Sequence, residues 1–312
     1  MNVLGISFGR KMSNCEIMVK AALKECEKQG HEIRFIEADA LNIKHCTGCI
    51  SCVVGMISGR GKGGCHLKDD FHIIDEALME CDGLILGCPT FEAMPTGLYK
   101  TVCDRIGPSH DVTFRKAAYE EGLAAGKPED QLPDKRSFKP RVGALISVGG
   151  AMTENWLAFM LPTMYMLPMS MDIKIVDAYQ YYGAMAYPHV LGNEPVMERA
   201  RKVGQNIADA LAQEGEARTK WRGDHEGVCP VCHCDMLTVS RDKTAVECPV
   251  CGIRGSFVVE GGKLQVTFSE EEQARSRLHI AGKVEHSTEI KTRAGEKGPI
   301  PDLQERLKEY KW

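Results

Sequence analysis

Five short apolar runs, separated by helical or polar sequence, recur along residues 1–213. They lie at 3–6, 31–37, 83–88, 141–148 and 172–178. Runs of this length that alternate with helical patterns are typical of βα units, whose parallel strands share one sheet. The sequence therefore predicts an α/β fold, in which residues 1–213 form a doubly wound five-stranded parallel sheet. Ligands of such a sheet bind at the carboxyl ends of its strands.

The turn after the first run is rich in hydrogen-bond donors, because residues 7–14 read SFGRKMSN and pass into a helical pattern. A tight strand-to-helix turn aims unpaired backbone N–H groups and the positive helix end at one point, which suits a phosphate. The turn has neither GxGxxG nor GxxxxGKS/T, which favours a mononucleotide. The other interpretation is an ordinary turn in which Ser13 caps the helix and Glu16 completes a capping box. The residues predicted to bind phosphate are Ser7, Arg10, Lys11, Met12, Ser13 and Asn14.

The set Gly5, Ser7, Arg10, Ser13 and Asn14 resembles the phosphate loop of the NADPH-dependent FMN reductases and iron–sulfur flavoproteins, which are flavodoxin-like. The resemblance covers about residues 1–212. It implies the flavodoxin strand order, FMN as the cofactor and NAD(P)H as the electron donor.

Two further strand ends are predicted to contact the flavin. The run 88–105 resembles the family's Pro-x-Tyr flavin loop and the helix that follows it, with Phe91 in place of the Tyr and Arg105 in register. After the fourth run, two glycines allow the backbone to approach a planar ring, and their free N–H groups can bond the flavin's pyrimidine oxygens. The predicted flavin contacts are Pro89, Thr90, Phe91, Glu92, Ser147, Gly149 and Gly150.

Four cysteines follow the second run, as Cys46, Cys49 and Cys52 at CxxCxxC spacing and then Cys65. Soft thiolates at this spacing bind an iron–sulfur cluster or zinc. Iron–sulfur flavoproteins, which the chain resembles, have their fourth cysteine shortly before an Asp pair, as Cys65 precedes residues 69–70. Two alternatives stay open: a four-iron, four-sulfur (4Fe–4S) cluster, or free thiols in a loop.

A polar insertion at residues 107–140 separates the predicted third helix from the fourth strand, with a short helical pattern at 113–125. A connection this long is commonly functional. We expect a lid over the flavin or an arm onto a second subunit. Ser109 and His110, at its start, are candidates for substrate contact.

Beyond a charged linker at 214–227, a second module carries two CPVC motifs with fifteen residues between them. Two CxxC pairs at this spacing make a tetrahedral four-thiolate site, here Cys229, Cys232, Cys248 and Cys251. The sequence predicts a small β-rich metal ribbon at 228–268, which needs its metal to fold. Zinc is the expected metal, and iron in a rubredoxin-like site is the alternative. A tail at 269–312 has helical patterns at 270–278 and 302–310.

Composition excludes several partners and compartments. A net charge of -4 and a pI near 6.2 give no reason to expect a nucleic-acid surface. The most apolar run, 156–171, contains two prolines and is too short to span a membrane. Fourteen cysteines without a secretory signal indicate metal or redox chemistry in a reducing compartment, so we expect a cytoplasmic protein.

The predicted function is an FMN-dependent NAD(P)H oxidoreductase that reduces a small organic acceptor such as a quinone, a flavin or a nitro compound. No acid–base or nucleophilic constellation stands out, so the catalytic residues stay unknown and the flavin is expected to carry the chemistry. One alternative is an iron–sulfur flavoprotein that carries electrons between redox proteins. Another is a degenerate scaffold on which the ribbon docks macromolecules. A homo-oligomer, dimer or tetramer, is expected.

Overall fold

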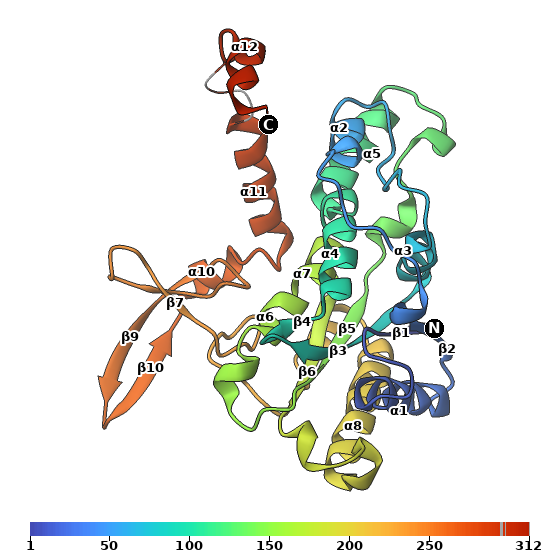
Figure 1. Cartoon of the computed structure of the whole chain (residues 1–312), viewed down its shortest axis with the longest axis vertical. Coiled ribbons are helices and arrows are strands. Elements are labelled where there is room, and N and C mark those ends of the chain that lie inside the picture. The colour runs from blue at the N-terminus through green and yellow to red at the C-terminus, as the bar shows by residue number, and fades with distance from the viewer. Residues whose placement is uncertain (294–295, 297, 312) are drawn as a thin grey trace.

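The computed structural model describes residues 1–293, 296 and 298–311. Its central sheet has the strand order β2-β1-β3-β5-β6, and all four neighbouring pairs are parallel (Figure 1). This confirms the predicted five-stranded parallel sheet and the flavodoxin order. The strands are β1 (Asn2–Ser7), β2 (Glu32–Glu37), β3 (Gly83–Phe91), β5 (Val142–Val148) and β6 (Lys174–Tyr181).

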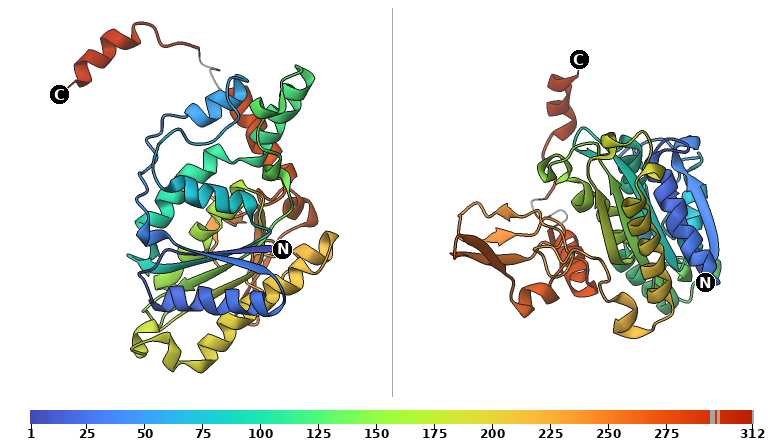
Figure 2. Two further views of the ribbon diagram at one scale, coloured as in Figure 1. Left: turned by 90° about the vertical axis from the view of Figure 1, so that its right-hand side faces the viewer. Right: turned by 90° about the horizontal axis from the view of Figure 1, so that it is seen from below.

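Helices cover both faces of this sheet (Figure 2). On one face, α1 (Asn14–Lys28) packs directly against α8 (Glu194–Leu211). Gly204 permits this close approach, because a Cβ atom there would collide with the Ala22 carbonyl of α1. The other face is covered by α3 (Phe71–Glu80), α4 (Gly97–Ser109), α6 (Met160–Met164) and α7 (Met166–Ser170).

Two connections extend beyond the sheet. The cysteine-bearing connection between β2 and α3 contains the short helix α2 (Ser51–Ile57). The insertion continues from α4 into α5 (Val112–Ala124), which packs beside α2 (Figure 1). The insertion therefore lies against the cysteine-bearing connection.

The C-terminal module is a separate antiparallel sheet of order β10-β9-β8-β7. It is joined to the α/β domain by a hydrogen bond of 2.6 Å from the Tyr165 hydroxyl to the Cys232 carbonyl. The segment before it, which contains α9 (Gly215–Thr219), is held to the edge of the central sheet, since the Arg222 N–H donates to the Val176 carbonyl at 2.7 Å. The strands are β7 (Thr238–Val239), β8 (Val246–Glu247), β9 (Arg254–Glu260) and β10 (Lys263–Thr267).

The tail forms α10 (Glu270–Ala274), α11 (Ile280–Arg293) and α12 (Leu303–Leu307), and α12 stands away from the body (Figures 1 and 2). The helical patterns at 270–278 and 302–310 thus correspond to α10 and α12, while α11 was not predicted. Residues 294, 295, 297 and 312 of the predicted tail lie outside the described residues. Among the helices that the structure describes, none is long and apolar enough to cross a membrane.

Candidate functional site

The turn after β1 forms a compact cradle. The Gly9 N–H donates to Ser7 Oγ at 3.2 Å, and the Ser13 N–H donates to the Arg10 carbonyl at 3.1 Å. Met12 has a φ of 55°, which turns the chain sharply into α1. A Cβ atom at Gly9 would lie 2.8 Å from Ser13 Oγ, so a larger residue there would displace the Ser13 hydroxyl.

Ser13 occupies the N-cap position of α1, but its side chain makes no capping hydrogen bond. Glu16 instead pairs with Lys20 at 2.5 Å, so the capping-box interpretation is wrong. Ser13 Oγ is buried and has no hydrogen-bond partner among the residues that the structure describes. A ligand at the turn could therefore receive its hydrogen bond.

The outer part of the turn is braced from a distant segment. The Val190 N–H donates to Asn14 Oδ1 at 2.8 Å, and His189 Nε2 lies 3.0 Å from the Met12 carbonyl. The predicted phosphate contacts Arg10, Lys11 and Met12 are exposed. The amide oxygen of Asn14, another predicted contact, already accepts the hydrogen bond from the Val190 N–H. The bracing role of residues 189–190 left no signal in the sequence.

The second predicted segment, Pro89–Glu92, runs into a tight hairpin with β4 (Met94–Pro95). Glu92 and Ala93, its two turn residues, have φ values of 47° and 63°. This conformation strains residues other than glycine, and such strain clusters at functional sites. Phe91 is 57% exposed, so its ring is available to a ligand or a partner.

The third predicted segment follows β5. The Gly149 N–H donates to the Tyr181 carbonyl at 2.9 Å, so this N–H group is not free for a flavin oxygen, contrary to the expectation. A side chain at Gly149 would collide with the buried Leu157, so close packing requires this glycine, whereas Gly150 meets only the exposed side chain of Met185.

The donor set nevertheless fits a flavin mononucleotide. Ser13 Oγ, Thr90 Oγ1 and Ser147 Oγ are buried and lack hydrogen-bond partners within the described part of the chain. They follow or end β1, β3 and β5, three neighbouring strands whose carboxyl ends share one edge. A buried hydroxyl without a partner costs about 1–3 kcal/mol. A ligand that bonds all three would recover this cost.

The four N-terminal cysteines do not gather into one ligand group. Among the described residues, the only group of ligand atoms close enough to share a metal ion lies in the ribbon. Cys49 Sγ lies 3.9 Å from His66 Nδ1 and accepts a hydrogen bond of 3.3 Å from Ser51 Oγ. That hydrogen bond lowers the pKa of the exposed Cys49 thiol, while burial raises the pKa of Cys52.

Ser109 and His110 were expected to contact substrate, but both are buried. Ser109 Oγ donates to the Arg105 carbonyl at 2.5 Å, and His110 Nε2 lies 2.7 Å from Asp75 Oδ1. His110 is 3% exposed. The Ser109 hydroxyl bonds within α4 and His110 links α4 to α3, so their contact with substrate stays a prediction.

The ribbon cysteines form the predicted four-thiolate group. The sulfur atoms of Cys229, Cys232, Cys248 and Cys251 are buried and lie within 4.8 Å of one another. Two of the Sγ–Sγ distances are 3.6 Å and 3.5 Å. A tetrahedral zinc site with Zn–S bonds of about 2.3 Å has sulfur atoms about 3.8 Å apart, so the group fits zinc.

The two CPVC motifs have matching backbone geometry. His233 and Gly252 follow them with φ values of 57° and 72°. The first motif is followed by His233 where the second is followed by a glycine, and the His233 ring stacks on Trp221 with the ring centroids 4.0 Å apart.

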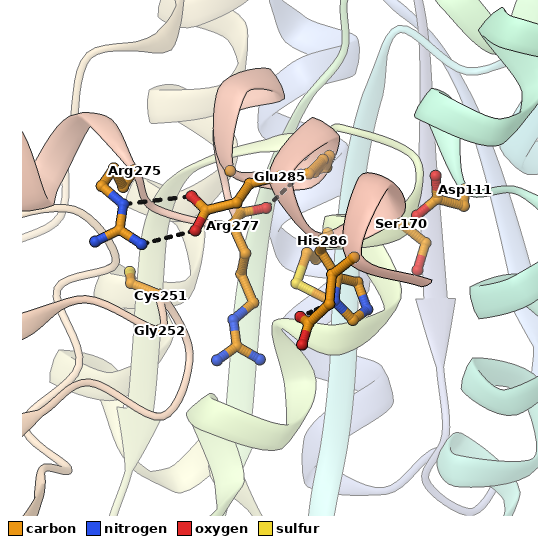
Figure 3. Close-up of a pocket in the computed structure, with 12 residues that line it drawn as sticks. Asp111, Ser170, Cys251, Gly252, Arg275, Arg277, Glu285 and His286 are labelled. Carbon is orange, nitrogen blue, oxygen red and sulfur yellow. Dashed lines mark hydrogen bonds and ion pairs between the residues drawn. The ribbon is translucent and has the colours of Figure 1, made fainter. Parts of the chain in front are cut away.

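A cavity of about 410 Å³ lies between the second motif, α7 and α11 (Figure 3). The Arg277 N–H donates to the Cys251 carbonyl at 2.9 Å, and its guanidinium would lie 2.7 Å from a Cβ atom at Gly252. Arg275 pairs with Glu285 of α11 at 2.7 Å. These contacts make the tail a support for the second motif.

A larger cavity of about 670 Å³ lies between the first motif and β6. Aromatic, apolar, polar and charged side chains share its lining, and a mixture of apolar and a few polar groups is common in pockets for small organic molecules. Neither Gln180 nor Tyr182, on the sheet side of this cavity, was predicted as a site residue, because isolated polar and aromatic residues at a strand end carry no motif.

Comparisons with known proteins agree with this geometry. A family model for NADPH-dependent FMN reductase matches residues 1–173. A flavone synthase of Aspergillus candidus is 31% identical over 297 residues, covering 93% of this chain and 88% of that protein. A solved structure of a flavone reductase has a TM-score of 0.82 and 27% identity, covering 99% of this chain and 96% of that one. An iron–sulfur flavoprotein of Archaeoglobus fulgidus is 31% identical over 34% of this chain and 48% of its own length.

Proposed function

Because this chain belongs to the NADPH-dependent FMN reductase family, we propose that it transfers reducing equivalents from NAD(P)H to a flat, oxygenated aromatic acceptor of the flavone type. Family membership makes it an FMN-dependent oxidoreductase. The choice of acceptor rests on how much of the chain the relatives cover. Two relatives that align with nearly the whole chain, ribbon included, are named for flavones.

When bound, FMN supplies the hydride-transfer chemistry. The residues of the chain bind and orient it. Arg10, Ser13 and the N-terminal end of α1 hold the phosphate, since a planar guanidinium, a hydroxyl and the helix dipole all favour an anion. The strained hairpin after Thr90 and the hydroxyl of Ser147 would hold the ring system of the flavin.

The electron-carrier alternative has less support. Its cluster would need Cys46, Cys49, Cys52 and Cys65 to converge, and within the described residues these do not form a ligand group. The iron–sulfur flavoproteins that match also align with only 34–48% of the chain. The net charge of -4 gives no support to a role for the ribbon in docking nucleic acid.

Several exposed apolar side chains in the segments that follow β3, β5 and β6 support a homo-oligomer. Such a surface on a protein marks an interaction site. We propose that a second copy of the chain covers it, which light scattering on a sizing column would test. The patch contains Phe91, Met94, Met152, Trp156 and Met185, which are 57%, 46%, 74%, 60% and 85% exposed.

The function is tested by anaerobic oxidation of NAD(P)H with FMN-loaded protein and matched concentrations of a flavone, a quinone, a nitroaromatic compound and a ferredoxin. We expect the flavone to give the highest kcat/KM and a product two hydrogens heavier by mass spectrometry. Turnover with the ferredoxin alone would instead support the carrier. Absence of FMN binding would overturn both.

A further inference from the structure

We propose that the ribbon forms the outer wall of the acceptor pocket, so that residues 233–236 determine which acceptor binds. This inference rests on the proposed function and adds the location of its acceptor. The pocket is the cavity of about 670 Å³ between β6 and the first CPVC motif. Its volume lies within the range of about 300–1,000 Å³ that is usual for small-molecule sites.

The pocket exists because β6 is an edge strand. The segment before the ribbon pairs with this edge at Val176 through the Arg222 N–H, and it then leaves the strand. Ala178, Gln180 and Tyr182 line the space that opens beyond this point, and the first motif closes its other side. Without the ribbon, this side of β6 would be an open surface.

The pocket is related to the predicted flavin site through one pair of residues on neighbouring strands. Ser147 on β5 and Gln180 on β6 are paired in register, so their side chains lie on the same face of the sheet. Ser147 Oγ and Gln180 Oε1 are both buried, and neither has a hydrogen-bond partner in residues 1–293, 296 and 298–311. Ser147 is a predicted flavin contact and Gln180 lines the pocket, so the two proposed sites meet at this pair of neighbouring strands.

The lining suits a flat aromatic molecule with hydroxyl groups. Gln180 donates through Nε2 to the Tyr182 hydroxyl, which fixes the amide and leaves Oε1 to accept from a phenol. Leu161 and Pro162 give an apolar wall on one side. On the ribbon side, the flexible thioether of Met236 can adapt to the face of a ring.

The four-thiolate group sets the position of this wall. Cys232 immediately precedes residues 233–236, and its carbonyl accepts from Tyr165 of the α/β domain at 2.6 Å. His233 stacks on Trp221, and His225 Nε2 lies 2.6 Å from Asp235 Oδ2. A metal ion on the cysteines would therefore act on acceptor binding by holding the wall in place, while the chemistry stays with the flavin.

Met236→Trp tests the wall, because the larger indole would fill the space from the ribbon side. Val239→Trp is the matched control, since Val239 lies on the same ribbon, is 63% exposed and does not line the pocket. The readout is calorimetric titration of the oxidised, FMN-loaded full chain with a hydroxylated flavone. Elemental analysis for the metal verifies that the ribbon of each variant is folded, and the visible flavin spectrum verifies that its α/β domain is folded.

We expect Met236→Trp to weaken flavone binding at least tenfold and Val239→Trp to match the wild type. Gln180→Leu, which keeps the size of the side chain, should weaken binding of a hydroxylated flavone and leave unsubstituted flavone unaffected. Equal flavone affinity for wild type and Met236→Trp would overturn the proposal that the ribbon forms a wall of the acceptor pocket, and would leave the proposed acceptor standing. Failure of the wild type to bind any flavone, although NAD(P)H reduces its FMN, would overturn the proposed acceptor instead.

Discussion

The Arg105 guanidinium on α4 donates to Asp69 Oδ2, and the two side chains are 0% and 1% exposed. The same guanidinium donates to the Lys44 carbonyl at 3.2 Å and the Leu67 carbonyl at 3.4 Å. The Lys44 N–H in turn donates to Asp69 Oδ2 at 2.7 Å. The buried Arg105–Asp69 ion pair therefore holds together the start of the cysteine-bearing connection, at Lys44, and its end, at Leu67 and Asp69.

Replacing Arg105 by Met should destabilise the protein strongly. The change leaves the Asp69 carboxylate buried without its cation, which typically costs about 3–5 kcal/mol. Urea denaturation followed by circular dichroism measures this loss. Lys100→Met is the matched control, because the Lys100–Asp104 pair on the same helix is 60% and 44% exposed and should contribute at most about 1 kcal/mol. Equal effects of the two variants would contradict the anchoring role.

Asp69 should make stability depend on pH in acid. Burial would raise its pKa, but hydrogen bonds from Arg105 and from the Lys44 and Phe71 N–H groups hold the pKa below 3.8. The unfolded chain therefore takes up this proton first as the pH falls. The stabilisation is present above about pH 4 and is lost as the pH falls through the folded-state pKa. Urea midpoints at pH 6 and pH 3 should differ less for Arg105→Met than for the wild type.

Ser13→Ala should separate FMN binding from stability. Because Ser13 Oγ is buried and unpartnered among the described residues, its removal should leave the cofactor-free protein as stable as before or slightly more stable. The FMN dissociation constant, measured by flavin fluorescence, should rise about tenfold, or about 1.4 kcal/mol. Ser109→Ala is the control, since that hydroxyl already bonds the Arg105 carbonyl. It should lower stability and leave FMN affinity unchanged.

The ribbon should hold one metal ion per chain, and we expect zinc. Cys229→Ser should abolish the metal signal in elemental analysis, because it removes one of four converging thiolates. Cys234→Ser should retain the metal, since Cys234 lies outside the group. Chelation should melt the ribbon and leave FMN bound to the α/β domain. Iron in place of zinc would give the purified protein a red colour and contradict the choice of metal.

The sequence by itself determined the parallel sheet and the four-thiolate ribbon. Both structures follow from local sequence patterns. The sheet follows from apolar runs that alternate with helices, and the ribbon follows from two CxxC pairs whose short spacing brings their thiols to one point. The cradle after β1 is local as well, because a strand, a turn and a helix follow one another within a few residues.

Only the tertiary structure decided which groups meet across long distances in the chain. It buried His110 against Asp75, braced the cradle with His189, and engaged the Gly149 N–H that seemed free for a ligand. It also placed the ribbon beside Gln180 at the edge of the sheet. These contacts depend on how helices and strands pack against one another in three dimensions. The periodicity of a single segment does not predict which distant segment it will contact.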